Sequence, residues 1–506
     1  MKLASVRSRI TACLSSEMFF RVIVGFMIFQ ALWIVFTAKY PMAFDEDFHF
    51  GIIKLYTHHL SPFWERHPAD SDAFGAVTRD PSYLYHYLMS FILRFIRLFT
   101  QDQTIQVILL RLVNVGLFVG SLPIFRRLLL RSGASKAIVH SCLAVFILIP
   151  IVPLLAAQIN YDNLLLPLVG LSLLVAERVA SALRNQRKLE LGQLLCLAVL
   201  CLATSVVKYA FLPIALAIVI YIGFGIIRAF GPGKRLRQET RQSFHRLKML
   251  PRILLIFGLV LFGGLFIERE GLNTLRYHRP VPDCADVLTI EQCSAYGPWN
   301  RDYYLALNKS GDASDNPLTF TRSWFEGMWL RSYFTLAGPT EDYQTRGPLT
   351  VPSQSMIVFA VLGLALVPLY GRRVIKRYNA PLLELLTVVS VLYIGFLWVD
   401  EYLLYLHAGT AVAINGRYLL IIMLPVLLIV ALCAREAFRL VPKLMPWAVV
   451  TILACGLWGG GVMTYMIRSS DNWYWPGSAP QALNHAAQKV LVPITPGSRT
   501  ASQYLP

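Results

Sequence analysis

The sequence predicts an all-α polytopic membrane protein with about eleven transmembrane helices. Of its 506 residues, 56% are hydrophobic and only 15% are charged, and the mean hydropathy is +0.54. This composition excludes a soluble chain of this length. Apolar runs long enough to cross a bilayer recur along the chain. The net charge of +18 comes from basic residues in short clusters between those runs. Since these clusters form no continuous basic face, they report membrane topology and not a nucleic-acid partner.

The first span fixes the orientation of the chain. Lys2, Arg7 and Arg9 precede an apolar run from about Met18 to Ala38. The run is long enough to cross a bilayer, and no small-residue cleavage site follows it. We therefore expect a retained signal-anchor helix, a cytoplasmic N-terminus and an extracytoplasmic Asp45.

The next apolar stretch, Ser82 to Phe99, contains Arg94 and Arg97. A span here would invert every later loop and place basic clusters outside. An amphipathic helix lying in the outer interface agrees better with these charges. The first return span is then Gln106 to Phe125.

Nine further spans follow, near residues 137–155, 163–180, 192–207, 211–227, 253–267, 355–370, 380–399, 418–433 and 447–467. The implied cytoplasmic windows are 1–17, 126–136, 177–190, 228–252, 371–377 and 434–443. They hold 26 of the 47 Lys and Arg residues against five acids, as the positive-inside rule requires. We expect an N-terminal transmembrane module (1–267) with a catalytic first outer loop (39–105), an extracytoplasmic cap (268–354), C-terminal transmembrane helices (355–467) and an extracytoplasmic tail (468–506).

Two cysteines of the cap differ from the others in the chain. Cys284 and Cys293 lie close together in this outer loop, where an oxidising compartment permits a disulfide. Five cysteines sit in apolar spans and one in the N-terminal segment. We expect a disulfide between Cys284 and Cys293, with two free thiols as the alternative.

No Walker loop, dinucleotide fingerprint or CxxC pair is present, and the basic loop from Gly231 to Arg252 is too short for a nucleotide-binding domain. The energy for any reaction must therefore come with the substrate. An ATP-driven pump is disfavoured.

The predicted topology gathers polar residues on the outer face. They are Asp45, Glu46, Asp47, His49, Asn160, Tyr161, Asp162, Lys208, Tyr209, Asp400, Glu401, Asn415, Gly416, Arg417 and Tyr418. Charges are costly in a bilayer, and their convergence on one side indicates a functional site.

These residues resemble the GT-C superfamily of membrane glycosyltransferases, which includes protein O-mannosyltransferases and aminoarabinose transferases, and related uncharacterised bacterial membrane proteins. Asp45-Glu46 followed by His49-Phe50 after the first helix looks like the family's acidic first-loop motif. Further similar landmarks are Asp80-Pro81, Arg111-Leu112, Asn160-x-Asp162, Lys208-Tyr209, Gly416-Arg417-Tyr418-Leu419-Leu420 and Leu424-Pro425. The mannosyltransferase pattern has one residue fewer between the acids and His-Phe-Gly, so the resemblance leaves open whether Asp45 or Glu46 is the base.

The resemblance implies inverting transfer of a sugar from a polyprenyl-phosphate donor to an extracytoplasmic acceptor, which is a glycan, lipid or protein. Such a displacement needs one general base, Asp45 or Glu46. The leaving phosphate needs positive charge, and the candidates are Arg417, Lys208 and Arg111. His49, Asp162 and Tyr418 are further substrate-binding candidates. The sequence identifies no cofactor and leaves metal dependence open, with Asp47 and His49 as the candidate ligands of a divalent metal.

Each assignment has a structural alternative. The acidic cluster can be a solvated helix end, Lys208 and Arg417 can snorkel at the interface, and Asp162 can cap a helix. A transporter or lipid-linked-glycan flippase would place its ionisable residues near mid-membrane in two related halves, and no internal repeat is present. A non-catalytic partner in envelope polysaccharide assembly is the third alternative. A bacterial cytoplasmic membrane is favoured over the endoplasmic reticulum, with the active site outside.

Overall fold

The computed structural model describes residues 2–42, 45–309, 316–333, 350–468, 473–475, 477 and 479–497. Parts of the predicted cap and of the predicted C-terminal tail fall outside these ranges. Within them the chain is helical, and the one β-type pairing is an isolated bridge between Ala38 and Tyr474.

The helices before the cap are α1 (Lys2–Ser15), α2 (Glu17–Thr37), α3 (Glu46–Tyr56), α4 (Leu84–Arg97), α5 (Gln103–Leu130), α6 (Lys136–Leu148), α7 (Ile151–Ala156), α8 (Asp162–Ser181), α9 (Leu191–Val207), α10 (Leu212–Phe230), α11 (Lys234–Arg246) and α12 (Met249–Phe266). Those of the cap are α13 (Leu272–Tyr277), α14 (Cys284–Val287), α15 (Ile290–Ser294), α16 (Gly297–Leu307) and α17 (Pro317–Tyr333). The last are α18 (Val351–Arg377), α19 (Ala380–Ala408), α20 (Leu420–Ala437), α21 (Met445–Gly459), α22 (Gly461–Arg468) and α23 (Ala479–Ile494). Short single turns at Asp72–Phe74, Tyr209–Phe211 and Gly416–Leu419 connect them.

Nine helices in the described part of the chain are long and apolar enough to cross a membrane. They are Glu17–Thr37, Gln103–Leu130, Asp162–Gln186, Tyr209–Phe230, Met249–Tyr277, Val351–Arg377, Ala380–Ala408, Gly416–Leu440 and Met445–Met466. In the apolar part of Met249–Tyr277 only 6% of the residues are buried in the protein, so lipid is the environment that this hydrocarbon surface requires. The predicted all-α class and multi-pass membrane character are confirmed.

Two predicted spans are each interrupted. The range 137–155 consists of α6 and α7, which meet near Pro150, a residue without a backbone N–H to continue the hydrogen-bond ladder. The range 447–467 consists of α21 and α22, which meet at Gly460 and Gly461, where Gly461 has a positive φ of 54°. The predicted spans at these two ranges are therefore each built from two helices, and Met445–Met466 as a whole remains long and apolar enough to cross a membrane.

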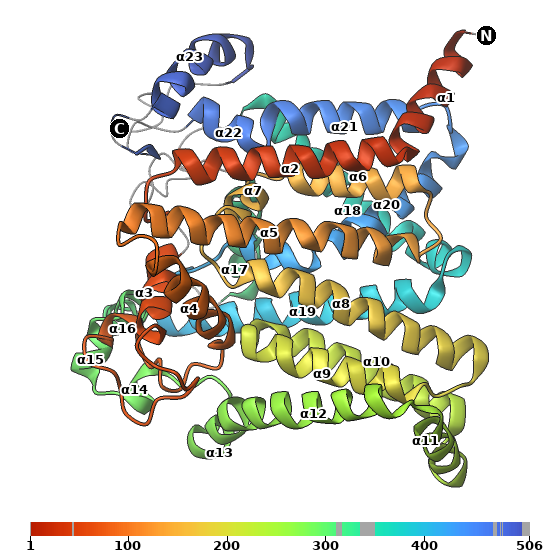
Figure 1. The fold of residues 1–506 in the computed structure, drawn as a ribbon. Helices are drawn as coiled ribbons and strands as arrows, with labels where there is room; N and C mark the ends of the chain where they lie inside the picture. The colour runs from red at the N-terminus through yellow and green to blue at the C-terminus, as the bar shows by residue number, and fades with distance from the viewer. Residues whose placement is uncertain are drawn as a thin grey trace.

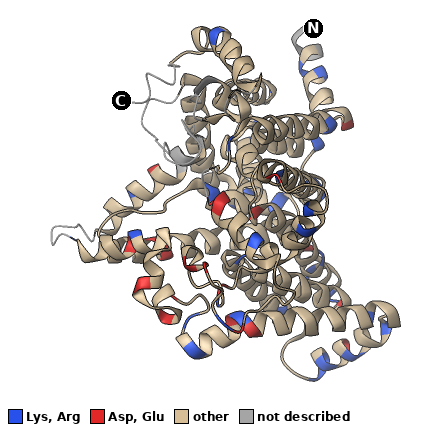
Figure 2. Ribbon diagram, turned by 60° about the vertical axis from the view of Figure 1, so that its left-hand side comes forward, with Lys and Arg blue, Asp and Glu red and all other residues tan. Residues whose placement is uncertain are grey.

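The long helices lie side by side, and two groups of short helices lie at their opposite ends (Figure 1). α3, α4 and α13–α16 gather at one end, near the start of α5, and α1 and α11 lie at the other. Lys and Arg mark the N-terminal helix in Figure 2. The first end is the one that the sequence predicts to be extracytoplasmic.

α4 lies in the predicted interfacial stretch and packs against α3. It has 14 residues, too few to cross a bilayer of ordinary thickness. Arg94 donates to the carbonyl oxygens of Tyr56, Thr57 and His59 at 2.6, 3.0 and 2.7 Å. These carbonyls belong to the C-terminal end of α3, where they lack helical partners. Arg94 therefore holds α3 and α4 together in the first outer loop.

Candidate functional site

Asp45 lies immediately before α3 in the left-handed region, with φ 72°. Its side chain is 45% exposed, and one carboxylate oxygen accepts a hydrogen bond from Nη2 of Arg417 at 2.7 Å. The Arg417 side chain is only 13% exposed. The pair therefore has a buried cation and an accessible anion.

Glu46, the next residue, has a different environment from Asp45. Its side chain and that of Arg111 are both fully buried, and Nε and Nη2 of Arg111 donate to the two carboxylate oxygens at 2.8 and 2.6 Å. The same carboxylate accepts from the backbone N–H groups of Met42 and Ile159 at 2.8 and 3.3 Å. Nη1 of Arg111 donates to the carbonyl of Ala38 at 2.6 Å. The pair joins α2, α3, α5 and the segment before α8.

This environment bears on two predictions from the sequence, both of which remain untested. Arg111 was a candidate for the lipid phosphate, but it is buried and its donors are directed at Glu46 and backbone carbonyls. Glu46 was the alternative general base, but both of its oxygens already accept hydrogen bonds inside the protein. We therefore assign this pair a structural role, since a substrate has no access to either side chain.

The segment that carries Arg417 is held tightly by its neighbours. Asn415 accepts a hydrogen bond from the backbone N–H of Arg417 at 2.9 Å, and Tyr393 donates to the carbonyl of Tyr418 at 2.8 Å. A side chain at Gly416 would overlap Oγ of Ser332 in α17. Only glycine fits this close approach. The guanidinium of Arg417 is thereby fixed above the Tyr418 ring, 5.1 Å from its centroid.

Asp162 and Lys208 form a second ion pair. Nζ of Lys208 lies 2.7 Å from Oδ1 of Asp162, and the two side chains are 8% and 3% exposed. Asp162 is the first residue of α8 and Lys208 follows the last residue of α9. Oδ2 of Asp162 is buried and has no hydrogen-bond partner among the described residues. An acceptor therefore remains beside the ammonium group.

His49 and His86 form a buried pair in the first outer loop, with Nδ1 of His49 2.9 Å from Nε2 of His86. Nδ1 of His86 lies 3.1 Å from the carbonyl oxygen of Ser82, which can only accept, so this nitrogen carries the His86 proton. Burial lowers the pKa of His86 to about 3, and burial with the charges of His86, Arg417 and Lys208 lowers the pKa of His49 well below its usual value. Both rings are thus neutral, and His49 donates through Nδ1.

The consequence of this tautomer is a free acceptor in the site. Nε2 of His49 keeps its lone pair, is buried, and has no partner among the described residues. The tautomer of His49 is fixed by the hydrogen bonds described above, and it does not depend on titration near neutral pH. A substrate hydroxyl is the kind of donor that this nitrogen can accept from.

Tyr161 connects the groups just described. Its ring centroid lies 4.5 Å from that of His49 and 4.2 Å from Nζ of Lys208. The same Nζ lies 6.0 Å from the Tyr418 ring. The predicted residues Asp45, His49, Asp162, Lys208, Arg417 and Tyr418 are therefore brought together from α3, α8, the end of α9 and the start of α20.

The candidate metal ligands do not form a complete set. Asp47 is exposed on the first turn of α3, whereas His49 is buried on the same helix. Among the described residues, no three or more His, Cys, Asp and Glu side chains are grouped to hold a metal ion. Asp47 and His49 therefore do not belong to a group of this kind within the described ranges.

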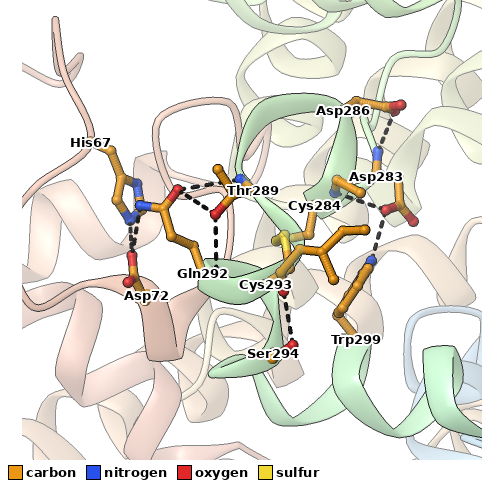
Figure 3. The surroundings of a disulfide bond; sticks show 12 residues. His67, Asp72, Asp283, Cys284, Asp286, Thr289, Gln292, Cys293, Ser294 and Trp299 are labelled. Atoms are coloured by element: carbon orange, nitrogen blue, oxygen red, sulfur yellow. Dashed lines mark hydrogen bonds and ion pairs between the residues drawn. A yellow bond between two sulfur atoms is a disulfide. The ribbon is translucent and has the colours of Figure 1, made fainter.

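The cap contains the disulfide between Cys284 and Cys293, which joins α14 and α15 (Figure 3). The side chains of Asp283 and Thr289 cap these two short helices through their backbone N–H groups. Gln292, beside the disulfide, donates to Asp72 of the first outer loop at 3.4 Å, and Asp72 also pairs with His67 at 2.8 Å. The disulfide therefore fixes the part of the cap that contacts the first outer loop.

The cap also contributes Tyr296 to the surroundings of the site. This ring packs 5.8 Å from Phe48 and against Gly75. Burial raises the pKa of Tyr296, and the negative charges of Asp45 and Asp80 raise it further. Tyr296 thus connects the cap with Phe48 of α3 and with Gly75 of the first outer loop.

Sequence reasoning missed His86 and Tyr296 as members of this site, and it placed Tyr161 on the outer face without giving it a role. His86 lies in α4, where its spacing of four residues from Ser82 is the one available signal, because that spacing permits a bond to the Ser82 carbonyl. Tyr161 and Tyr296 resemble any aromatic residue near a membrane surface. Their positions depend on contacts with segments far away in the chain.

Comparisons of this chain with protein-family models, with curated proteins and with solved structures find no match.

Proposed function

We propose that this protein is an integral-membrane glycosyltransferase that transfers a sugar from a polyprenyl-phosphate donor to an extracytoplasmic acceptor with inversion. The observation that carries the proposal is the pair of cation–carboxylate contacts, Asp45–Arg417 and Asp162–Lys208, whose two cations lie 5.1 and 6.0 Å from the Tyr418 ring. A base and a phosphate site are the two elements that this reaction needs. Carboxylates that can act as the base and cations that can bind phosphate both occur in these two ion pairs.

Asp45 is the general base in this proposal. Its carboxylate is accessible, in contrast to the buried Glu46 carboxylate with its bound Arg111. It accepts the proton of an acceptor hydroxyl while the acceptor oxygen forms a bond to the anomeric carbon. The bond from that carbon to the phosphate oxygen breaks, and polyprenyl phosphate leaves with the bonding electrons. No further reactant is required.

Arg417 and Lys208 bind the leaving phosphate. The guanidinium of Arg417 can form two parallel hydrogen bonds to phosphate oxygens, and Lys208 provides a compact charge nearby. A phosphate at Arg417 competes with Asp45 for the same guanidinium. Donor binding therefore weakens the Asp45–Arg417 contact and makes the carboxylate available to the acceptor.

His49, Asp162 and Tyr418 orient the substrates. Nε2 of His49 and Oδ2 of Asp162 are buried acceptors without a partner in the described part of the chain, and sugar hydroxyls are donors that match them. The Tyr418 ring lies under Arg417 and supports the guanidinium. None of these roles requires a cofactor.

The proposal includes a topology of eleven spans, with the N-terminus in the cytoplasm and the C-terminus outside. This count is supported by the nine long apolar helices and the two shorter apolar helices α6 and α9, each of which overlaps one predicted range. The site then lies on the extracytoplasmic side, most simply of a bacterial cytoplasmic membrane. The proposed organisation keeps the transmembrane module 1–267, the cap 268–354, the helices 355–467 and the tail 468–506.

The location of the ion pairs favours an enzyme over a transporter. Asp162, Lys208 and Arg417 lie at helix ends, whereas a transporter site is expected near the bilayer midplane. The decisive experiment incubates the purified protein with a panel of polyprenyl-phosphate sugars and measures the release of free polyprenyl phosphate. Release that requires both an acceptor and Asp45 supports the proposal, and no release with any donor rejects it.

A further inference from the structure

A cleft of about 780 Å³ runs along the helices α6, α18, α20 and α21. Its volume lies within the range of about 300–1,000 Å³ typical of ligand sites. One end is lined by Trp324 and Ser332 of α17 and by Leu419. The other end reaches Arg7 of α1. Leu419 directly precedes α20 and Arg435 lies in its last turn, so the cleft extends along most of this helix.

The middle of the cleft is apolar. Its lining side chains there include Val145, Phe359, Val426, Val430 and Ile452. Such a surface offers no partner for a polar ligand and fits a hydrocarbon chain.

Charge occurs at one end of the cleft. Four arginines and one glutamate line that end: Arg7, Arg377, Arg435, Arg439 and Glu436. Glu436 is shared by Arg377 at 3.5 Å and Arg439 at 3.1 Å. Arg435 stacks over the Tyr378 ring at 6.0 Å. Neither Arg7 nor Arg435 has a carboxylate within ion-pair distance among the described residues. This end of the cleft therefore has a net positive charge.

Among the described lining residues, the opposite end of the cleft has no charged side chains from α17. The lining residues from α17 that reach it are Trp324, Phe325, Met328 and Ser332, all uncharged. A cleft with arginines at one end and hydrocarbon along the rest matches an amphiphile with one anionic head. The head lies at the α1 end, away from Asp45 and Arg417.

We propose that this cleft binds one anionic phospholipid of the cytoplasmic leaflet. Its phosphate contacts Arg7 and Arg435, and its acyl chains lie along α6 and α20. Basic clusters between helices on the cytoplasmic side are suited to anionic head groups. The ligand is not the proposed sugar donor, because the donor phosphate must meet Arg417 at the other end. The proposal is independent of the glycosyltransferase reaction and requires only that the α1 end is cytoplasmic.

The lipid would connect two parts of the chain. α1 and α6 belong to the N-terminal half, and α18, α20 and α21 to the C-terminal half. A lipid in the cleft between them adds contacts to both. We therefore expect bound lipid to raise the unfolding temperature of the protein.

Native mass spectrometry of the purified full-length protein tests the proposal. The probes are phosphatidylglycerol and phosphatidylethanolamine with identical acyl chains, and the readout is the Kd of the first bound lipid. We expect tenfold or tighter binding of phosphatidylglycerol. The double variant Arg7→Gln/Arg435→Gln should weaken phosphatidylglycerol binding about tenfold or more, since charge-assisted hydrogen bonds are lost. The matched control Arg235→Gln/Arg237→Gln on the exposed helix α11 makes the same charge change away from the cleft and should bind normally.

A second variant keeps the test independent of the arginines. Ala360→Phe narrows the apolar part of the cleft and leaves every charge in place, and it should reduce retention of phosphatidylglycerol severalfold. Val219→Phe on the lipid-exposed face of α10 is its control. Three results would each overturn the proposal. They are equal Kd values for the two lipids, the same loss of phosphatidylglycerol binding in the α11 control, and full retention of phosphatidylglycerol in Ala360→Phe. Competition by polyprenyl phosphate that depends on Arg417 would assign the cleft to the donor instead.

Discussion

Asp45 and Arg417 lie 372 positions apart in the chain and are joined by an ion pair of 2.7 Å. The contact connects the start of α3 in the first outer loop with the start of α20. It makes the proposed base and the proposed phosphate ligand neighbours before any substrate binds. In the proposed reaction, a donor phosphate that binds Arg417 would therefore change the state of the Asp45 carboxylate, which acts on the acceptor.

Replacement of the base should affect the rate more than binding. Asp45→Asn should lower turnover by about 10²-fold or more, as loss of a general base usually does, without weakening donor binding. Release of polyprenyl phosphate and equilibrium binding of the donor measure the two effects. Asp47→Asn, an exposed neighbour on the same helix, should behave like the wild type. Normal turnover in Asp45→Asn would remove this mechanism.

Replacement of Arg417, the proposed phosphate ligand, should lower both the affinity for the donor and the turnover. Arg417→Ala should weaken donor binding about tenfold or more and also lower turnover, because a charge-assisted contact to the leaving group is lost. Arg417→Lys should recover part of the affinity but not the paired hydrogen bonds. Arg301→Ala on the exposed helix α16 is the control. Donor affinity that does not change in Arg417→Ala would place the phosphate elsewhere.

The Glu46–Arg111 pair should control stability. Arg111→Met leaves a buried carboxylate without its cation and should lower the free energy of unfolding by about 3–5 kcal/mol. The double variant Glu46→Gln/Arg111→Met should show a smaller decrease in the free energy of unfolding, because no unpaired charge remains. Thermal unfolding in detergent measures both. A double variant that is less stable than Arg111→Met would contradict this account.

The buried histidine pair predicts a pH dependence. The folded-state pKa of His86 is about 3 and the ordinary value is 6.5, so below about pH 6.5 the unfolded chain binds a proton that the folded chain excludes. The free energy of unfolding should then decrease as the pH falls, by about 1.4 kcal/mol per pH unit for this histidine, until the folded pKa is reached. His86→Asn should show a shallower decrease between pH 6 and 4. An identical slope in the variant would show that His86 is not held neutral.

The topology can be tested with labels at two loops. A cysteine introduced at Arg131 should react with a membrane-impermeant reagent only in inside-out vesicles. A cysteine introduced at Asn308 should react only in right-side-out vesicles, because the two proposed loops lie on opposite sides of the membrane. A variant without the native free cysteines is the background. Reaction of both sites in the same vesicles would exclude the proposed orientation.

Much of the fold was predictable because hydrophobic length is a local signal. The apolar runs, the charge clusters between them and the amphipathic stretch that became α4 can each be recognised within about twenty residues. The breaks at Pro150 and Gly460 were not predicted, since proline and glycine are common inside membrane helices and their effect depends on neighbouring helices.

The site was only partly predictable because partners are not local. The sequence indicated Asp45 and Arg417 separately, but it could not show that Arg111 is taken by Glu46 or that Lys208 is paired with Asp162. It offered no means of distinguishing the exposed Asp45 from the buried Glu46. That distinction comes from α5 and the segment before α8, which enclose one carboxylate and not the other.

The Glu46–Arg111 pair has a consequence for how the protein is made. All the hydrogen-bond partners of these two side chains lie between Val35 and Ile159, in the first third of the chain, and the Trp475 ring, 5.9 Å from the guanidinium of Arg111, is the later addition. Chains emerge from the ribosome N-terminus first, and their early parts can associate before the rest is synthesised. The pocket around Asp45 can thus assemble while Arg417 is still untranslated. Arg417 then enters a prepared site, so a truncated chain should insert stably and yet remain inactive.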